Sequence, residues 1–232
     1  MENAEILDLN HPAVQHICKH DKRLKKVVQM VGPIQYSLHS DSNYSFLIHE
    51  IIEQMLSVKA GHVIYNRFEE LCGGVVDPTR VSQMSLEEIK KAGMSSSKAR
   101  SILAVTSAIA DKTIDLDSFC KMSDNEVVKQ LSSIHGIGKW TAKMYLLFVL
   151  GRPDVLPYED GAFLQTYRWL YKTKDCSPEA VEHKCQKWKP YRSVAARFFY
   201  RALDMGLTKK EFHLYKEELK CQEKKENGTL VS

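Results

Sequence analysis

The sequence lacks the cysteine patterns that hold a zinc ion or an iron–sulfur cluster. Its six cysteines form no Cys-x-x-Cys pair and no group at metal-ligand spacing. Scattered thiols of this kind are typical of reduced cysteines in an intracellular protein. We therefore expect no iron–sulfur cluster, no redox cofactor and no metal held by side chains. The cysteines stand at positions 18, 72, 120, 176, 185 and 221.

Long apolar runs and alternating strand patterns are also scarce. No segment approaches the roughly 18 consecutive apolar residues of a membrane span. The N-terminal stretch MENAEILDLNHPAV carries no basic-then-apolar signal, which favours an intracellular protein. Apolar residues make up 44% of the chain and charged residues 27%, which argues against disorder and indicates a folded core.

Charge of either sign is present without a strong excess. The formal net charge is +4. A mild basic balance permits a polyanionic partner such as nucleic acid but does not require one.

Helix signals, in contrast, recur along the whole chain. Apolar residues fall at helical spacing in many segments, and glycine or proline follows most of them. We predict an all-α fold of about ten helices joined by short turns. The helix-start pattern S/T-x-x-E occurs three times, at Ser85 with Glu88, Ser123 with Glu126 and Thr208 with Glu211, and Ser177-Pro178 adds a further start.

The stretch SSIHGIGKWTAKM, residues 132–144, joins two helical segments through two glycines. Gly136 and Gly138 allow a sharp turn and a close approach of another backbone. The unpaired amides at the start of the second helix can then bind an anion such as a DNA phosphate. A plain tight turn is the alternative, but the apolar residues specified on both sides favour a helix-hairpin-helix. Ile137 is predicted to enter the core, and Lys139 and Thr141 to belong to the DNA-binding hairpin.

An acidic loop, GRPDVLPYEDGAF, follows the hairpin. Acidic loops are most often solvated surface. A carboxylate close to a phosphate-binding hairpin is unfavourable for binding alone, so this one suggests chemistry on the bound molecule. Its carboxylates are Asp154, Glu159 and Asp160.

With these residues in place, the chain resembles the helix-hairpin-helix (HhH-GPD) DNA glycosylase superfamily, and within it the 3-methyladenine DNA glycosylase II branch. The resemblance implies a two-lobed helical fold with the active site in the cleft between the lobes and no β-rich N-terminal domain. We expect one lobe at 45–154, ending in the hairpin, and a second formed by 1–44 and 155–232. Besides the hairpin, three motifs carry the resemblance: IIEQMLSVKAG at 51–61, GMSSSKARSI at 93–102 and WKPYRSVAARFFYRAL at 188–203.

The resemblance also assigns the catalytic residue. In the family an aspartate lies three residues after a proline in the loop beyond the hairpin, which is Asp160 after Pro157 here. Glu159 departs from the glycine that many relatives have before this aspartate. Trp140 stands where relatives that also cut the DNA strand carry a lysine, so the resemblance implies a monofunctional enzyme without AP lyase activity.

Further positions match family roles. Met55 or Leu56 is expected to wedge into the duplex, although Met55 is equally explained as a core residue at a helix end. Arg192 is expected either to contact phosphate or to anchor the loop of Asp160. The expected base pocket consists of Trp140, Met144, Tyr200 and Gln54.

The function predicted from this resemblance is base excision repair of alkylation damage. The enzyme would flip 3-methyladenine or 7-methylguanine out of double-stranded DNA and hydrolyse the N-glycosidic bond, leaving an abasic site. We expect a monomer, in the cytoplasm or nucleoid of a prokaryote or the nucleus of a eukaryote, with a monovalent cation allowed at the hairpin backbone. The alternatives are a non-catalytic or weakly active DNA-binding paralogue, and a glycosylase for another purine such as hypoxanthine or an etheno adduct.

Overall fold

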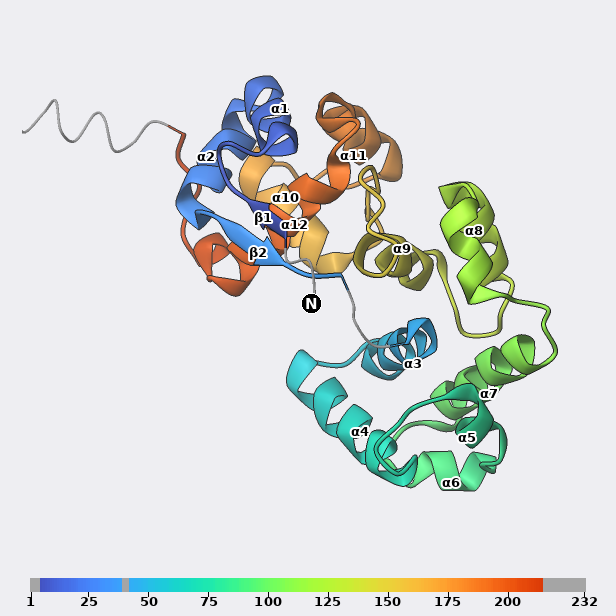
Figure 1. The fold of residues 1–232 in the computed structure, drawn as a ribbon. Helices are drawn as coiled ribbons and strands as arrows, with labels where there is room; N and C mark the ends of the chain where they lie inside the picture. Colours follow the sequence, from blue (N-terminus) through green and yellow to red (C-terminus); the bar gives the residue numbers. More distant parts are fainter. Residues whose placement is uncertain (1–4, 39–41, 215–232) are drawn as a thin grey trace, which may run out of the picture. The chain divides into compact units, whose positions relative to one another are not determined.

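The structure, a computed structural model, describes residues 5–38 and 42–214 (Figure 1). Within these residues the chain forms twelve α-helices, three short 3-10 helices and one two-stranded sheet. The predicted all-α fold is confirmed, since the described β structure consists of β1 (Glu5–Leu7) and β2 (Ile34–Tyr36), each of three residues. No helix in these ranges has both the length and the apolar character needed to cross a membrane.

Contacts divide the chain into two compact units, Met1–Glu5 with Gln35–Glu159 and Ile6–Ile34 with Asp160–Ser232. The expected lobes placed the loop before Asp160 in the second unit. Val155 and Leu156 of this loop are each only 4% exposed, and Val155 belongs to the core of the first unit. The loop therefore stays with the first unit up to Glu159.

The first unit contains the hairpin. Its elements are α3 (Asn43–Glu53), α4 (Val58–Leu71), α5 (Pro78–Ser82), α6 (Leu86–Lys90), α7 (Ser96–Ala110), the 3-10 helix η1 (Leu116–Lys121), α8 (Asp124–Ser132) and α9 (Lys139–Phe148).

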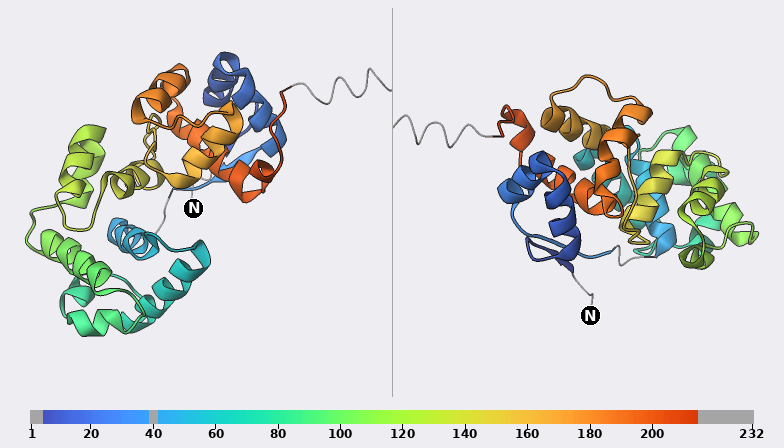
Figure 2. Two further views of the ribbon diagram at one scale, coloured as in Figure 1. Left: turned by 180° about the vertical axis from the view of Figure 1, so that it is seen from behind. Right: turned by 90° about the horizontal axis from the view of Figure 1, so that it is seen from above.

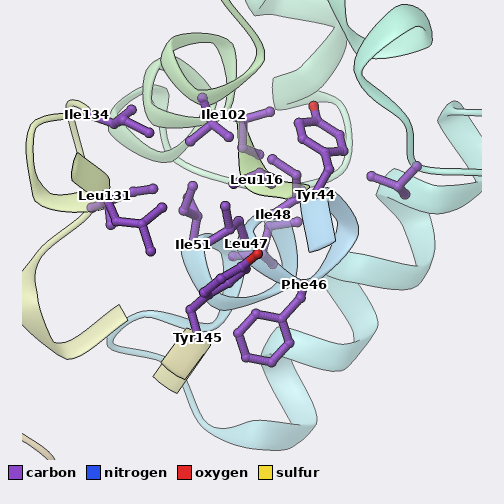
Figure 3. Close-up of a cluster of buried hydrophobic side chains, with 14 of the residues drawn as sticks. Tyr44, Phe46, Leu47, Ile48, Ile51, Ile102, Leu116, Leu131, Ile134 and Tyr145 are labelled. Atoms are coloured by element: carbon purple, nitrogen blue, oxygen red, sulfur yellow. The ribbon is translucent and has the colours of Figure 1, made fainter. Parts of the chain in front are cut away.

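The core of this unit surrounds α3, whose apolar residues cover most of its circumference. Figure 3 shows the side chains of Leu47 and Ile51 in the same cluster as Leu131 and Ile134, which come from the segment before the hairpin. Tyr145 of α9 closes the cluster and is completely buried. The hairpin is thus anchored on both sides by apolar burial against α3, the main stabilising term in folding.

The second unit is built around the packed helices α10 (Gly161–Tyr171) and α12 (Arg192–Asp204). Its elements are α1 (Pro12–His20), α2 (Lys22–Val31), α10 (Gly161–Tyr171), α11 (Pro178–Cys185), α12 (Arg192–Asp204) and the 3-10 helices η2 (Gln186–Trp188) and η3 (Leu207–Lys209).

In this unit α10 packs along α12, and α2 packs against α12 (Figure 2). Asp21, only 3% exposed, caps the N-terminus of α2. Its carboxylate accepts hydrogen bonds from the Tyr171 hydroxyl and from Trp188 Nε1, the latter at 3.0 Å, and lies 2.9 Å from Lys187 Nζ. Burial alone would raise the pKa of Asp21, but the hydrogen bonds from Tyr171, Lys187 and a backbone amide hold it below its usual value.

Local helix starts follow the sequence with one exception. The capping boxes at Ser85 and Ser123 are both reciprocal, and Ser177 caps α11 with proline at its first position. The start predicted at Thr208 is wrong, because Thr208 lies inside η3, which follows Gly206. Glu211 instead pairs with Lys172 at 2.7 Å, a contact with α10's end that no local pattern encodes.

Candidate functional site

The hairpin turn requires glycine at Gly136 for two separate reasons. Its φ is +86°, in the left-handed region that side chains with a Cβ avoid. A Cβ built there would also lie 1.8 Å from Ser101 Oγ of α7. Ile137, the next residue, is 4% exposed and belongs to the core, as predicted. The turn therefore packs against α7 at Gly136 and is anchored in the core by the Ile137 side chain.

Gly138 has a different role. Its φ is −92°, which any residue adopts, and a Cβ built there would meet nothing within 4 Å. As the N-cap of α9 it provides no side-chain acceptor for the first amides of the helix. Lys139, next to it, is exposed. The open space over Gly138, the amides without a side-chain cap and the charge of Lys139 together suit an anion at the N-terminus of α9.

Gln54, the C-cap of α3, contacts the hairpin through its side chain. Its Nε2 donates to the Gly136 carbonyl at 3.1 Å and to Thr141 Oγ1 at 3.2 Å. Thr141 is 1% exposed, so this hydroxyl is fixed within the unit. In the structure the Gln54 amide braces the end of α3 against the hairpin, and the base-pocket role that the family resemblance implies for Gln54 stays a prediction.

The turn after α3 presents Met55 to solvent. Met55 is fully exposed and has φ +59°, and Leu56 is 40% exposed. The interpretation of Met55 as a core residue is wrong. The end of α3 is held in place by Lys98, whose Nζ donates to the Ile52 carbonyl at 2.6 Å. An exposed apolar side chain on a braced turn fits a wedge that enters a base stack.

The expected pocket residues are divided between the units. Trp140 and Met144 lie on α9 in the first unit, where Met144 is 4% exposed and Trp140 packs half-buried against the core. Tyr200 lies half-buried on α12 in the second unit.

Asp160 opens the second unit as the N-cap of α10. Its Oδ1 accepts a hydrogen bond of 2.7 Å from the Phe163 amide, and the residue is 8% exposed. A helix N-terminus favours a negatively charged cap. The predicted catalytic carboxylate is thus fixed by the helix that it starts.

Sequence reasoning missed Lys143. Its Nζ lies 2.9 and 2.7 Å from the two carboxylate oxygens of Glu159 and donates to the Leu156 carbonyl at 3.0 Å. It also lies 3.4 Å from the centre of the Tyr158 ring. The helical position of Lys143 and the extra carboxylate in the loop were visible in the sequence, but nothing there joined them.

Arg192, at the start of α12, pairs with Glu182 of α11. Its Nη1 lies 2.7 Å from Glu182 Oε1, and its side chain is 13% exposed. The contact ties together two helices of the second unit. Neither of the two roles expected for Arg192 is tested by this pairing.

Comparison with known proteins identifies the family. Residues 48–190 match the model of the HhH-GPD superfamily base excision DNA repair proteins. The chain is 30% identical over 195 residues to the alkylbase DNA glycosidase-like protein mag2 of Schizosaccharomyces pombe, covering 82% of this chain and 92% of that protein. It is 28% identical to DNA-3-methyladenine glycosylase 1 of the same yeast, covering 86% and 90%.

Solved structures agree with this result. The DNA-3-methyladenine glycosidase of Bacillus halodurans matches with a TM-score of 0.76 at 30% identity, covering 85% of this chain and 92% of that one. The 3-methyladenine DNA glycosylase of Schizosaccharomyces pombe, solved in complex with abasic DNA, matches with a TM-score of 0.75 at 28% identity, covering 83% and 96%. The family that the sequence resemblance predicted is confirmed: the chain belongs to the HhH-GPD superfamily of base excision DNA repair proteins.

Proposed function

We propose that this protein is a monofunctional DNA glycosylase that removes alkylated purines such as 3-methyladenine and 7-methylguanine and leaves an abasic site. The observation that carries the proposal is the pairing, in one chain, of an uncapped hairpin helix with a buried carboxylate at the Pro-x-x-Asp position. Similar proteins named as 3-methyladenine DNA glycosylases support the substrate class.

DNA binding is assigned to the hairpin and the turn after α3. The first amides of α9 would donate to a backbone phosphate that approaches over Gly138, and Lys139 would add charge attraction. Met55 would enter the stack and fill the space left by the extruded nucleotide. Flipping costs a few kcal/mol, and least for a damaged base, which contributes to selectivity.

Bond cleavage is assigned to Asp160. An alkylated purine carries positive charge, so it leaves readily as a neutral base, and an aromatic face such as that of Trp140 would attract it. As the C1′–N bond breaks, the Asp160 carboxylate would stabilise the oxocarbenium-like sugar and orient a water. The water oxygen bonds to C1′, and its proton passes to the carboxylate and then to solvent.

The same residues support hydrolysis without strand cleavage. A lyase step needs an amine that forms a Schiff base with the sugar, and Trp140 supplies none. Hydrolysis also requires no redox cofactor. A monovalent cation at the hairpin would be held by backbone carbonyls, the oxygen donors that hard cations prefer, and would add positive charge against the phosphate.

The test is release of 3-methyladenine and 7-methylguanine from methylated duplex DNA. Asp160→Asn should lower the rate by at least about 100-fold while binding to abasic-site DNA persists. Asp154→Asn, a carboxylate of the same loop outside the proposed site, is the matched control and should release base normally. Borohydride trapping of the wild-type protein on abasic DNA should give no covalent adduct.

A wild-type protein that binds abasic-site DNA but releases neither base would contradict the proposal. It would favour the non-catalytic paralogue or a different damaged purine, and release assays on hypoxanthine and ethenoadenine DNA would separate these two.

A further inference from the structure

The Lys143 ammonium has an unusually complete set of contacts for a lysine side chain. It meets both carboxylate oxygens of Glu159, the Leu156 carbonyl and the face of the Tyr158 ring. These three partners belong to one short segment of chain. The side chain is 15% exposed and that of Glu159 is 23% exposed, so water screens the pair only partly.

Lys143 lies on α9, which is anchored in the core of the first unit. Its neighbours in α9, Ala142 and Met144, are 0% and 4% exposed and belong to the core cluster of the first unit. Lys139, at the first position of α9, lies one helical turn away, about 6 Å along the axis. The same rigid helix therefore provides the anion-binding end of the hairpin and the ammonium that grips the loop.

The loop gripped by Lys143 ends at Asp160. Glu159 is the residue before it in the chain, and Leu156, four residues before it, is buried. On the other side, Asp160 is fixed as the N-cap of α10. Lys143 thus fixes the chain on one side of the proposed catalytic carboxylate, and α10 fixes it on the other.

The pair also places a positive charge against the Glu159 carboxylate. A carboxylate at this point, without a partner, would oppose the approach of phosphate and would repel the neighbouring Asp160 carboxylate. Removing Lys143 alone would leave the Glu159 carboxylate uncompensated, which costs more free energy than removing both charges. Removing Glu159 alone costs less, because Lys143 keeps the Leu156 carbonyl and the Tyr158 ring as partners. Surface pairs, such as Lys90 with Glu87, lack this property because solvent screens them.

We propose that Lys143 is a positioning residue of the base-excision reaction: it clamps the Leu156–Glu159 segment to the hairpin helix and neutralises Glu159, so that Asp160 is held in its reactive place. This inference rests on the proposed function, because it needs Asp160 to act in catalysis. Lys143 acts through the loop and is assigned no contact with substrate.

The experiment compares single-turnover base release with binding to abasic-site DNA. Lys143→Met should release base about 10- to 100-fold more slowly, the loss expected for a misplacement of about 1 Å, while its affinity for abasic DNA stays within about twofold of wild type. Lys143→Arg, which keeps the charge, should release base at a rate between those of the wild type and Lys143→Met. Lys90→Met, which breaks a surface pair of the same unit, is the matched control and should behave as wild type.

The decisive variant is Lys143→Met combined with Glu159→Gln. Because it removes both charges, it should release base faster than Lys143→Met alone, whereas Glu159→Gln in the wild-type background should slow release slightly. A purely structural role for Lys143 predicts that the two losses add. If Lys143→Met alone fails to fold, the double variant is compared with Glu159→Gln, in which Lys143 still holds Leu156, and the double variant should be the slower.

Three results would overturn the inference: a wild-type rate in Lys143→Met, a double variant no faster than Lys143→Met when both fold, or equal losses of rate and DNA affinity. Failure of the proposed function is distinct, since it appears as absence of base release from the wild type or as full activity of Asp160→Asn.

Discussion

Replacing Gly136 by alanine should destabilise the protein, whereas the same change at Gly138 should not. At Gly136 the left-handed conformation costs a residue with a Cβ about 1–2 kcal/mol. The new methyl group would start 1.8 Å from Ser101 Oγ and 2.3 Å from Ser101 Cβ, so α7 or the turn must move. Relief of such overpacking costs about 1–3 kcal/mol, which brings the expected loss to roughly 2–5 kcal/mol of unfolding free energy.

Urea unfolding of the two alanine variants measures this difference directly. Gly138→Ala has ordinary backbone angles and open space, so its stability should stay within about 0.5 kcal/mol of wild type. Its affinity for abasic-site DNA should nevertheless fall, because the methyl group occupies the approach to the uncapped amides of α9. One glycine variant thus tests the fold and the other tests the surface.

A second change separates the two parts of the Gly136 penalty. Ser101→Gly removes the atoms that the new methyl group would strike, at a helix cost of about 0.5–1 kcal/mol. The combined variant should therefore be more stable than the sum of the single losses predicts, by an amount that reports the clash. Equal stability of both single alanine variants, or strict additivity with Ser101→Gly, would refute the reasoning about this turn.

Three further predictions concern the brace, the buried acid and the cation. Gln54→Met removes two hydrogen bonds to the hairpin and should lower the free energy of unfolding by about 1–2 kcal/mol. It should also weaken binding to abasic DNA in an anisotropy assay. An unchanged affinity with slower base release would instead favour a pocket role for Gln54. Asp21→Asn should lower the free energy of unfolding by about 1–3 kcal/mol at pH 7. Because the pKa of Asp21 is lowered in the folded protein, its stabilising contribution is present above the unfolded pKa of about 4 and is lost in acid, so the deficit measured by urea unfolding should shrink below about pH 4. An equal deficit at both pH values would contradict this. Replacing potassium and sodium by a bulky organic cation at constant ionic strength should weaken DNA binding, and an unchanged affinity would assign the phosphate contact to the amides and Lys139 alone.

Much of this protein was predictable because its signals are local. The capping boxes at Ser85 and Ser123 involve residues three apart, which interact through the backbone of one helical turn. Ile137 entered the core as expected, since an apolar residue between two helix ends has few other places to go. The wrong prediction of a helix start at Thr208 shows the limit of local signals. Thr208 lies inside η3, and Glu211, which the pattern would use as its cap, pairs with Lys172.

The two glycines of the hairpin show where local signals end. In the sequence the two glycines carry the same turn signal. In the structure the packing of α7 makes glycine obligatory at Gly136, whereas a Cβ at Gly138 would meet nothing within 4 Å. Conformation at a turn is a short-range property, whereas the space around it depends on which helix the core brings alongside.

By itself the sequence determined the helices, the hairpin and the family, because periodicity, capping and motif order act within a few residues of chain. Only the tertiary structure decided the partners of the functional side chains. Gln54 meets Thr141 across 87 positions, and Lys143 meets Glu159 across 16. These pairings have no local signature, since they follow from how apolar burial packs α3, α9 and the acidic loop into one core, and that packing is a property of the whole unit.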